Sequence, residues 1–301
     1  METNIRNVII IAQKEFADHI WSPRFLGFAI TFTLIVFVFG YQRGTEVDYL
    51  EHLMGTDGML RGFLGIAKVV GTFAPLIGIV LGFDTIVREV KSSSLNVLLT
   101  HPVFRDNIIA GKIIGSAICL FLILLISITI STGTMLTVSG VPADGEDILR
   151  IGIFIILTFF YALIFLGIGV ITSILVKNSS NSLVYNIAIW LFFTILFSQI
   201  ILSCVYTLTG AMEGSIDLAV GSGVLNLSPG HHYAQVAMGA NNVGWGGGLG
   251  GDPRIAGIFD THFTITQWLA EFWMNLVVLI VTPIILLIIA FIVFLRKDIT
   301  R

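Results

Sequence analysis

Apolar residues occur along the chain in six long runs that are separated by shorter polar segments. An α-helix needs about 20 apolar residues to cross the hydrocarbon core of a bilayer, and most of the runs reach or exceed this length. The pattern therefore predicts six transmembrane helices, over residues 25–41, 66–83, 113–138, 151–176, 183–208 and 268–295. The predicted fold class is an all-α integral membrane protein with one transmembrane domain, residues 1–301.

A different helical pattern precedes the first run. One face of this segment is apolar and is formed by Ile5, Val8, Ile9, Ala12, Phe16 and Ile20. Polar residues such as Lys14 and Asp18 lie on the opposite face. This amphipathic pattern, bounded by Ser22 and Pro23, favours a helix that lies in the membrane interface over residues 1–24. The alternative is an early extension of the first span.

Two of the polar connections are expected to have structure of their own. Residues 84–112, between the second and third predicted spans, are too polar to lie in the membrane and too patterned for a simple linker. Residues 209–267, between the fifth and sixth, form a connection far longer than an ordinary loop. Within it, the apolar stretches 218–227 and 233–238 are too short to span a bilayer. They are long enough for re-entrant or interfacial helices.

Composition and charge agree with a membrane protein. Charged residues make up only 12% of the chain, about half of what a soluble domain contains, so the excess of apolar residues must face lipid. If the N-terminus is inside, 11 of the 16 lysine and arginine residues lie on the inner side. This bias predicts that both termini are cytoplasmic, in a multi-pass protein of the plasma membrane. A net charge of -3 gives no support to a nucleic-acid partner.

Metal-binding residues are sparse. Cys119 and Cys204 each lie inside an apolar run, so they form neither a disulfide framework nor a paired-cysteine metal site. The adjacent pair His231 and His232 could contribute to a metal site, but no companion ligand stands at the usual spacing. We therefore predict no metal site on this chain.

The inner connection, residues 84–112, has the pattern of a short docking helix. A serine of the run 92–94 can cap a helix in which Leu95, Leu98 and Leu99 share one face, and Pro102 ends it. A short helix with an apolar face and flanking charges can dock into a groove of a partner protein. The same leucines could instead pack beneath the membrane domain, and the pattern alone leaves both interpretations open.

The residues of this connection resemble the cytoplasmic signature of ABC-2 type permeases, the membrane subunits of a class of ABC transporters. The matching residues are Arg88-Glu89, Ser93-Ser94-Leu95, Leu98-Leu99, His101-Pro102-Val103, Arg105 and Gly111-Lys112. Two positions depart from the family pattern, because Ser93 replaces the usual glycine and Phe104 the usual serine. The likeness extends to an interfacial first helix, six spans and Ser228-Pro229 in the long connection before the last span.

The resemblance implies that residues 84–112 couple this chain to a separate ATP-binding subunit. The contact or framing residues that it implies are Glu89, Leu95, Leu98, Leu99, Pro102 and Arg105. It also implies that two permease chains, identical or different, enclose the substrate path and that residues 209–267 contain re-entrant helices on the outer side. Export is the favoured direction, and the substrate class is left open. The alternative function is an ATP-independent channel or scaffold in the membrane.

A nucleotide-binding motif is missing from the sequence. The pair Gly111-Lys112 is followed by Ile113 rather than by serine or threonine, and position 106 is aspartate, so no P-loop is formed. We therefore predict a non-catalytic membrane subunit without a cofactor of its own, with ATP and magnesium on the partner subunit.

Two prolines fall inside predicted spans. Pro75 and Pro283 remove backbone donors from the second and sixth helices, which favours a kink at each position. Such kinks can act as hinges in a transporter. The alternative is structural tolerance, since neighbouring helices often satisfy the freed backbone groups in membrane proteins.

Overall fold

The computed structural model describes residues 2–54, 58–91, 105–209, 223–240, 243 and 255–297, and within these ranges the regular structure is helical. The helices are α1 (Glu2–Ile20), α2 (Pro23–Met54), α3 (Gly58–Gly82), α4 (Val87–Lys91), α6 (Arg105–Ser139), α7 (Gly145–Leu175), α8 (Ser179–Leu191), the π-helix η1 (Phe192–Leu196), α9 (Phe197–Thr209), α11 (Pro229–Met238) and α12 (Ile265–Arg296).

Six helical segments are long and apolar enough to cross a membrane, which confirms the predicted all-α integral membrane fold. These segments are Pro23–Val47, Met59–Glu89, Arg105–Ser139, Gly145–Leu175, Ser179–Leu196 and Ile265–Arg296. The third begins eight residues earlier than predicted from the apolar run. The last residues of the predicted inner connection, 105–112, therefore belong to the first two turns of α6.

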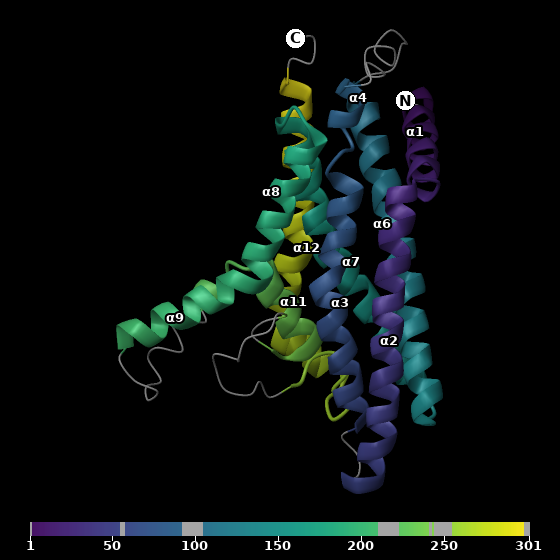
Figure 1. Cartoon of the computed structure of the whole chain (residues 1–301), viewed down its shortest axis with the longest axis vertical. Coiled ribbons are helices and arrows are strands. Elements are labelled where there is room, and N and C mark those ends of the chain that lie inside the picture. The colour runs from purple at the N-terminus through teal and green to yellow at the C-terminus, as the bar shows by residue number, and fades with distance from the viewer. Residues whose placement is uncertain are drawn as a thin grey trace.

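The long helices run side by side as an elongated bundle (Figure 1). At one end of the bundle lie α1, α4 and the last turns of α12, and we call this the α1 end. The short helix α11 lies in the other half of the bundle, where it contacts α3, α7 and α12. It falls within the long connection 209–267 and includes the apolar stretch 233–238 for which a short helix was predicted.

The fifth span differs from the prediction of one continuous helix over residues 183–208. The π-helix η1 interrupts it, and beyond this point α9 runs away from the bundle (Figure 1). A π-helical turn inserts an extra residue into the hydrogen-bond ladder and so redirects the helix that follows. Apart from Thr194, the segment Phe192–Leu196 is apolar, and for this reason the hydrophobic pattern does not mark the break.

Small and hydroxylated residues bring neighbouring helices close together. In the pair formed by α2 and α6, Ser131 donates a 2.7 Å hydrogen bond to the carbonyl oxygen of Val36, and the hydroxyls of Thr33 and Ser127 are 2.7 Å apart. A Cβ atom at Gly40 would lie only 2.4 Å from the carbonyl oxygen of Ser131. Such contacts are typical of helix packing in lipid, where apolar surface alone does not drive association.

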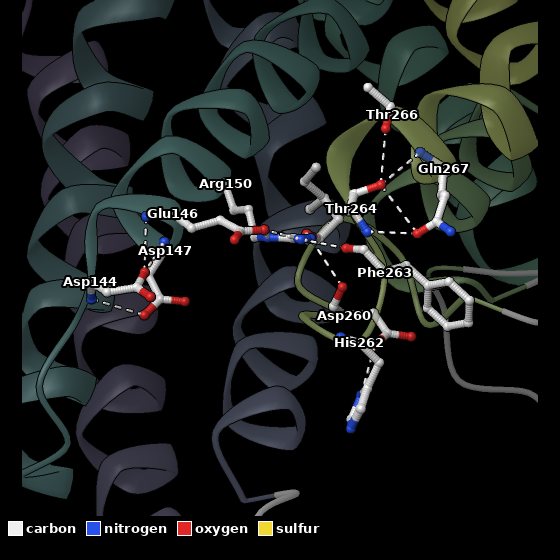
Figure 2. A network of polar contacts seen from close by, with 11 residues as sticks. Asp144, Glu146, Asp147, Arg150, Asp260, His262, Phe263, Thr264, Thr266 and Gln267 are labelled. Atoms are coloured by element: carbon white, nitrogen blue, oxygen red, sulfur yellow. Dashed lines mark hydrogen bonds and ion pairs between the residues drawn. The ribbon is translucent and has the colours of Figure 1, made fainter.

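The end opposite α1 is organised around Arg150, near the start of α7. Its side chain is 1% exposed and reaches the segment that precedes α12, as Figure 2 shows. Nη1 donates hydrogen bonds to the carbonyl oxygens of Ile258 and Asp260, at 2.6 and 3.0 Å, and Nη2 donates to that of Phe263 at 2.6 Å. The guanidinium also pairs with Glu146 one turn earlier in α7. Arg150 thereby fixes the entry into α12.

Candidate functional site

The α1 end contains a buried cluster of charged side chains centred on Lys112 of α6. Lys112 Nζ lies 2.6 Å from Glu15 Oε2 of α1 and 2.8 Å from Glu89 Oε1 of α4. The side chains of Lys112 and Glu15 are 2% and 3% exposed, and that of Glu89 is 12% exposed. One ammonium group therefore joins three helices. We call these three residues together with His19 and Ser116 the Lys112 cluster.

His19 extends the cluster along α1. Its Nε2 is 3.4 Å from Glu15 Oε1, one turn away in the same helix, and 3.0 Å from the hydroxyl of Ser116 in α6. Both histidine and serine are buried. The two helices are thus linked at two levels, by Lys112 with Glu15 and by Ser116 with His19.

Glycines in α6 allow α1 to approach closely enough for these contacts. A Cβ atom at Gly111 would lie 2.7 Å from Cβ of Ile11, and one at Gly115 would lie 2.6 Å from the carbonyl oxygen of Ala12. Gly111 and Gly115 are four residues apart and therefore lie on one face of the helix, a spacing that often marks close helix packing in membranes. Lys112 stands directly beside this contact face.

The face of α1 that is buried is partly polar. Ala12, Glu15 and His19 are buried against the bundle, whereas Ile5 and Ile9 of the predicted apolar face are 60% and 50% exposed. The exposed isoleucines suit contact with lipid, which agrees with the amphipathic pattern. Sequence reasoning missed Glu15 and His19 as site residues. A usable signal existed in their i, i+4 spacing on one face of the predicted helix, together with Lys112 immediately before an apolar run.

The electrostatics of the cluster favour the ionised form of Glu15. Burial opposes ionisation, but the hydrogen bond from His19 and the ammonium of Lys112 outweigh it and lower the pKa of Glu15 to about 2. A buried ion pair is costly to desolvate and adds little net stability, yet removal of one partner leaves a buried charge uncompensated at a cost of about 3–5 kcal/mol. The cluster is therefore a strong constraint on how α1, α4 and α6 are placed.

Two of the residues implied as coupling residues lie in the described part of the chain. Glu89 points inward to Lys112, so it frames the connection from within. Arg105 begins α6, and its Nη1 lies 3.5 Å from the carbonyl oxygen of Lys297 at the end of α12. The remaining four, Leu95, Leu98, Leu99 and Pro102, lie outside the described residues. Glu89 and Arg105 flank that segment.

Comparison with known families decides the membership of the chain. The model of the ABC-2 family transporter protein matches residues 9–299, which is nearly the whole sequence. The chain belongs to this ABC-2 family. Two similar relatives are both described as probable ABC transporter permease protein NosY, one from Stutzerimonas stutzeri and one from Pseudomonas aeruginosa. Each is 25% identical to this chain over 64% of its residues, and the matches cover 68% and 69% of the two relatives.

The two prolines that were predicted to fall inside spans of this ABC-2 chain lie in helices that continue through them. Pro75 is in α3 and Pro283 is in α12, and both are buried. Near Pro75, Trp190 Nε1 of α8 donates a 3.1 Å hydrogen bond to the carbonyl oxygen of Thr72. The carbonyl that Pro75 leaves without its intrahelical donor is that of Gly71, so the Trp190 bond ties α8 to α3 beside this position and does not replace the missing bond. The hinge role stays a prediction.

The histidine pair of this ABC-2 chain is buried in α11. Nδ1 of His232 lies 2.6 Å from Oδ1 of Asn275, and its Nε2 lies 2.8 Å from the carbonyl oxygen of Asn226. His232 therefore uses both ring nitrogens to tie α11 to α12 and to the turn before it. Among the described residues, no three histidine, cysteine or acidic side chains form a group that could hold a metal ion.

Proposed function

We propose that this ABC-2 permease is driven by a separate ATP-binding subunit that docks on residues 84–112, and that it exports its substrate across the plasma membrane. In this arrangement the α1 end and both termini face the cytoplasm, and a second permease chain, identical or different, completes the substrate path. The family membership supports a permease subunit of an ABC transporter. The absence of a P-loop in the sequence supports an ATPase on another chain.

The Lys112 cluster is the observation that carries the proposed mechanism. Residues 92–104 connect α4 to α6, and Glu89 and Lys112 join the flanks of this connection directly at 2.8 Å. A force applied to the connection would therefore be shared by α4, by α6 and, through Glu15, by α1. Closure of the ATP-binding subunits would move these helices as one unit, because separating any of them would strand a buried charge. The permease itself performs no covalent chemistry.

The decisive experiment places charge on the proposed docking face. In the double variant Leu98→Asp/Leu99→Asp, two carboxylates would have to be buried without partners, at a cost of several kcal/mol. We expect the amount of ATP-binding subunit that co-purifies in mild detergent to fall by at least about a hundredfold, since each 1.4 kcal/mol is about tenfold in affinity. Membrane levels and the detergent elution profile should be unchanged.

A matched control separates docking from general damage. Ile148→Asp adds a carboxylate at a side chain that is 64% exposed, near the start of α7 at the other end of the bundle. It should leave co-purification intact. Retention of the ATPase by the leucine double variant at wild-type stoichiometry would remove residues 84–112 as the docking surface. A purified chain that never brings an ATPase with it would favour the ATP-independent channel or scaffold.

A further inference from the structure

A cavity of about 620 Å³ opens at the α1 end. Its walls come from three transmembrane segments: the start of α2, the end of α3 with the turn that follows, and the start of α8. All three segments have an end of their candidate membrane span here, so the cavity lies where the hydrocarbon core gives way to the headgroup layer. Two of its lining residues, Asp84 and Arg88, belong to the connection 84–112, but neither is among the residues of the Lys112 cluster.

The polar part of the wall carries an excess of positive charge. Arg24 and Arg88 both line the cavity, with Asp84 as the one acidic residue of the lining. Asp84 is buried and faces Arg24, with 3.6 Å between Oδ2 and Nη1. Arg88 is exposed and has no ion pair with any residue in the described part of the chain. One guanidinium is therefore left over for an anionic ligand, and guanidinium is well suited to bidentate contact with phosphate.

The start of α8 adds backbone donors to the same wall. Ser179 and Ser180 line the cavity and form the first turn of this 13-residue helix. The residue at the N-cap position, Asn178, makes no side-chain hydrogen bond to that turn. The amide groups of the first turn thus have no side-chain acceptor, and the helix dipole favours negative charge at this position. These backbone donors add to the attraction that the two arginines exert on an anion.

The remaining wall is apolar and opens toward the lipid-facing surface. Phe28 and Leu183 line the cavity from α2 and α8, and the side chain of Phe28 is 47% exposed. Two aromatic residues nearby in the chain, Trp21 and Tyr185, are 78% and 53% exposed. Exposed tryptophan and tyrosine are typical of the membrane–water boundary. The cavity therefore offers cationic groups beside an apolar surface, which matches a molecule with an anionic head and acyl chains.

We infer that the cavity binds the headgroup of an anionic phospholipid from the leaflet at the α1 end. The phosphate lies between Arg88 and Arg24 at the N-terminus of α8, and the acyl chains follow the apolar surface past Phe28 and Leu183. Such a lipid joins α2, α3 and α8. The inference goes beyond the proposed function, because it requires the membrane position of the chain but neither ATP nor a particular cargo.

The test is a lipid titration of the full chain purified in mild detergent, together with any subunits that accompany it. Phosphatidylglycerol should raise the thermal unfolding midpoint in a saturable manner, whereas phosphatidylcholine should not. In Arg88→Gln the half-saturating concentration of phosphatidylglycerol should rise at least about tenfold, as expected for loss of a charge-assisted contact. The charge-matched control is Arg61→Gln, an exposed arginine in the first turn of α3 at the other end. It should titrate like the wild type.

Each contrary outcome has a definite meaning. Equal stabilisation by phosphatidylglycerol and phosphatidylcholine, or an unchanged titration in Arg88→Gln, would overturn the lipid site. Inorganic phosphate that stabilises the protein as well as phosphatidylglycerol would reassign the cavity to a free anion. If Arg88→Gln reduces only the co-purification of the ATP-binding subunit, the arginine belongs to a protein contact and the lipid site is wrong. Because none of these readouts measures ATP-driven transport, failure here leaves the proposed function standing.

Discussion

Lys112 and Arg150 are both almost fully buried cations near the first turns of successive long helices, and they are held in different ways. At the α1 end, Lys112 is neutralised by Glu15 and Glu89 from two other helices. At the other end, Arg150 makes most of its contacts with backbone carbonyl oxygens of residues 258–263, and its one carboxylate partner, Glu146, is half exposed.

The difference assigns a different physical role to each end. The Lys112 cluster depends on charge, because each partner left alone would be a buried ion. The Arg150 contacts depend on shape, since the planar guanidinium presents several donors that an ammonium cannot place in the same directions. The first arrangement fixes helices to one another where a partner is proposed to push. The second arrangement fixes the backbone of residues 258–263, which precede α12.

The largest effect is expected when Lys112 is removed. Lys112→Met leaves Glu15 and Glu89 facing each other in a buried site, and we expect a loss of about 3–5 kcal/mol in the free energy of unfolding. The measurement is the amount of intact chain in the membrane and its elution profile in detergent. The triple variant Glu15→Met/Glu89→Met/Lys112→Met removes all three charges and should recover most of the loss. Wild-type behaviour of Lys112→Met alone would show that charge does not hold the α1 end.

The second-largest effect is expected when Arg150 is replaced by a cation of a different shape. Arg150→Lys retains the cation but cannot reach the three carbonyl oxygens together, so we expect a loss of about 2 kcal/mol, in the range of hydrogen bonds to charged groups. His262, which is 68% exposed in the turn, provides a local probe. A cysteine introduced there should be labelled faster in the Arg150→Lys background. Equal labelling and an unchanged unfolding midpoint would mean that the guanidinium geometry is not needed.

Acid should weaken the α1 end through Glu15. Its pKa is about 2 in the folded protein against a reference of 4.5, so the stabilisation is fully present above pH 4.5 and is lost as the pH falls toward 2. By pH 3.5 the loss should be about 1 kcal/mol, by the conversion of 1.36 kcal/mol per pKa unit. We expect the unfolding midpoint of the wild type to fall more steeply with acid than that of Glu15→Gln. Parallel curves would contradict the assignment.

The sequence predicted the spans but not the contacts that hold them together. Long apolar runs report the length of a membrane helix directly, so all six spans were found. Helical periodicity relates residues three or four positions apart, whereas Lys112 and Glu15 are separated by 97 positions. No pattern in one sequence tells which helices will pack. The early start of α6 was missed for the same reason, because Lys112 is placed inside the helix only by its distant partners.

Sequence reasoning also missed the break in the fifth span. Residues 192–196 are apolar apart from Thr194 and contain neither proline nor glycine, the residues that usually mark a kink. Of the residues implied for coupling, the structure describes Glu89 and Arg105. It also shows that Glu89 contacts Lys112, which in turn contacts Glu15, and that Glu15 lies next to His19. The resemblance to ABC-2 permeases pointed to the connection 84–112, whose coupling role stays a prediction. The buried residues that Glu89 contacts could be identified only from the three-dimensional structure.

The smallest expected effect gives the scale of an uncharged tie between helices. Trp190→Phe removes the 3.1 Å hydrogen bond to the carbonyl oxygen of Thr72 while keeping an aromatic ring between α8 and α3. A neutral hydrogen bond contributes about 0.5–1.5 kcal/mol, so the unfolding midpoint should fall less than in either cation variant. If Trp190→Phe costs as much as Arg150→Lys, the contrast between neutral and charged ties fails.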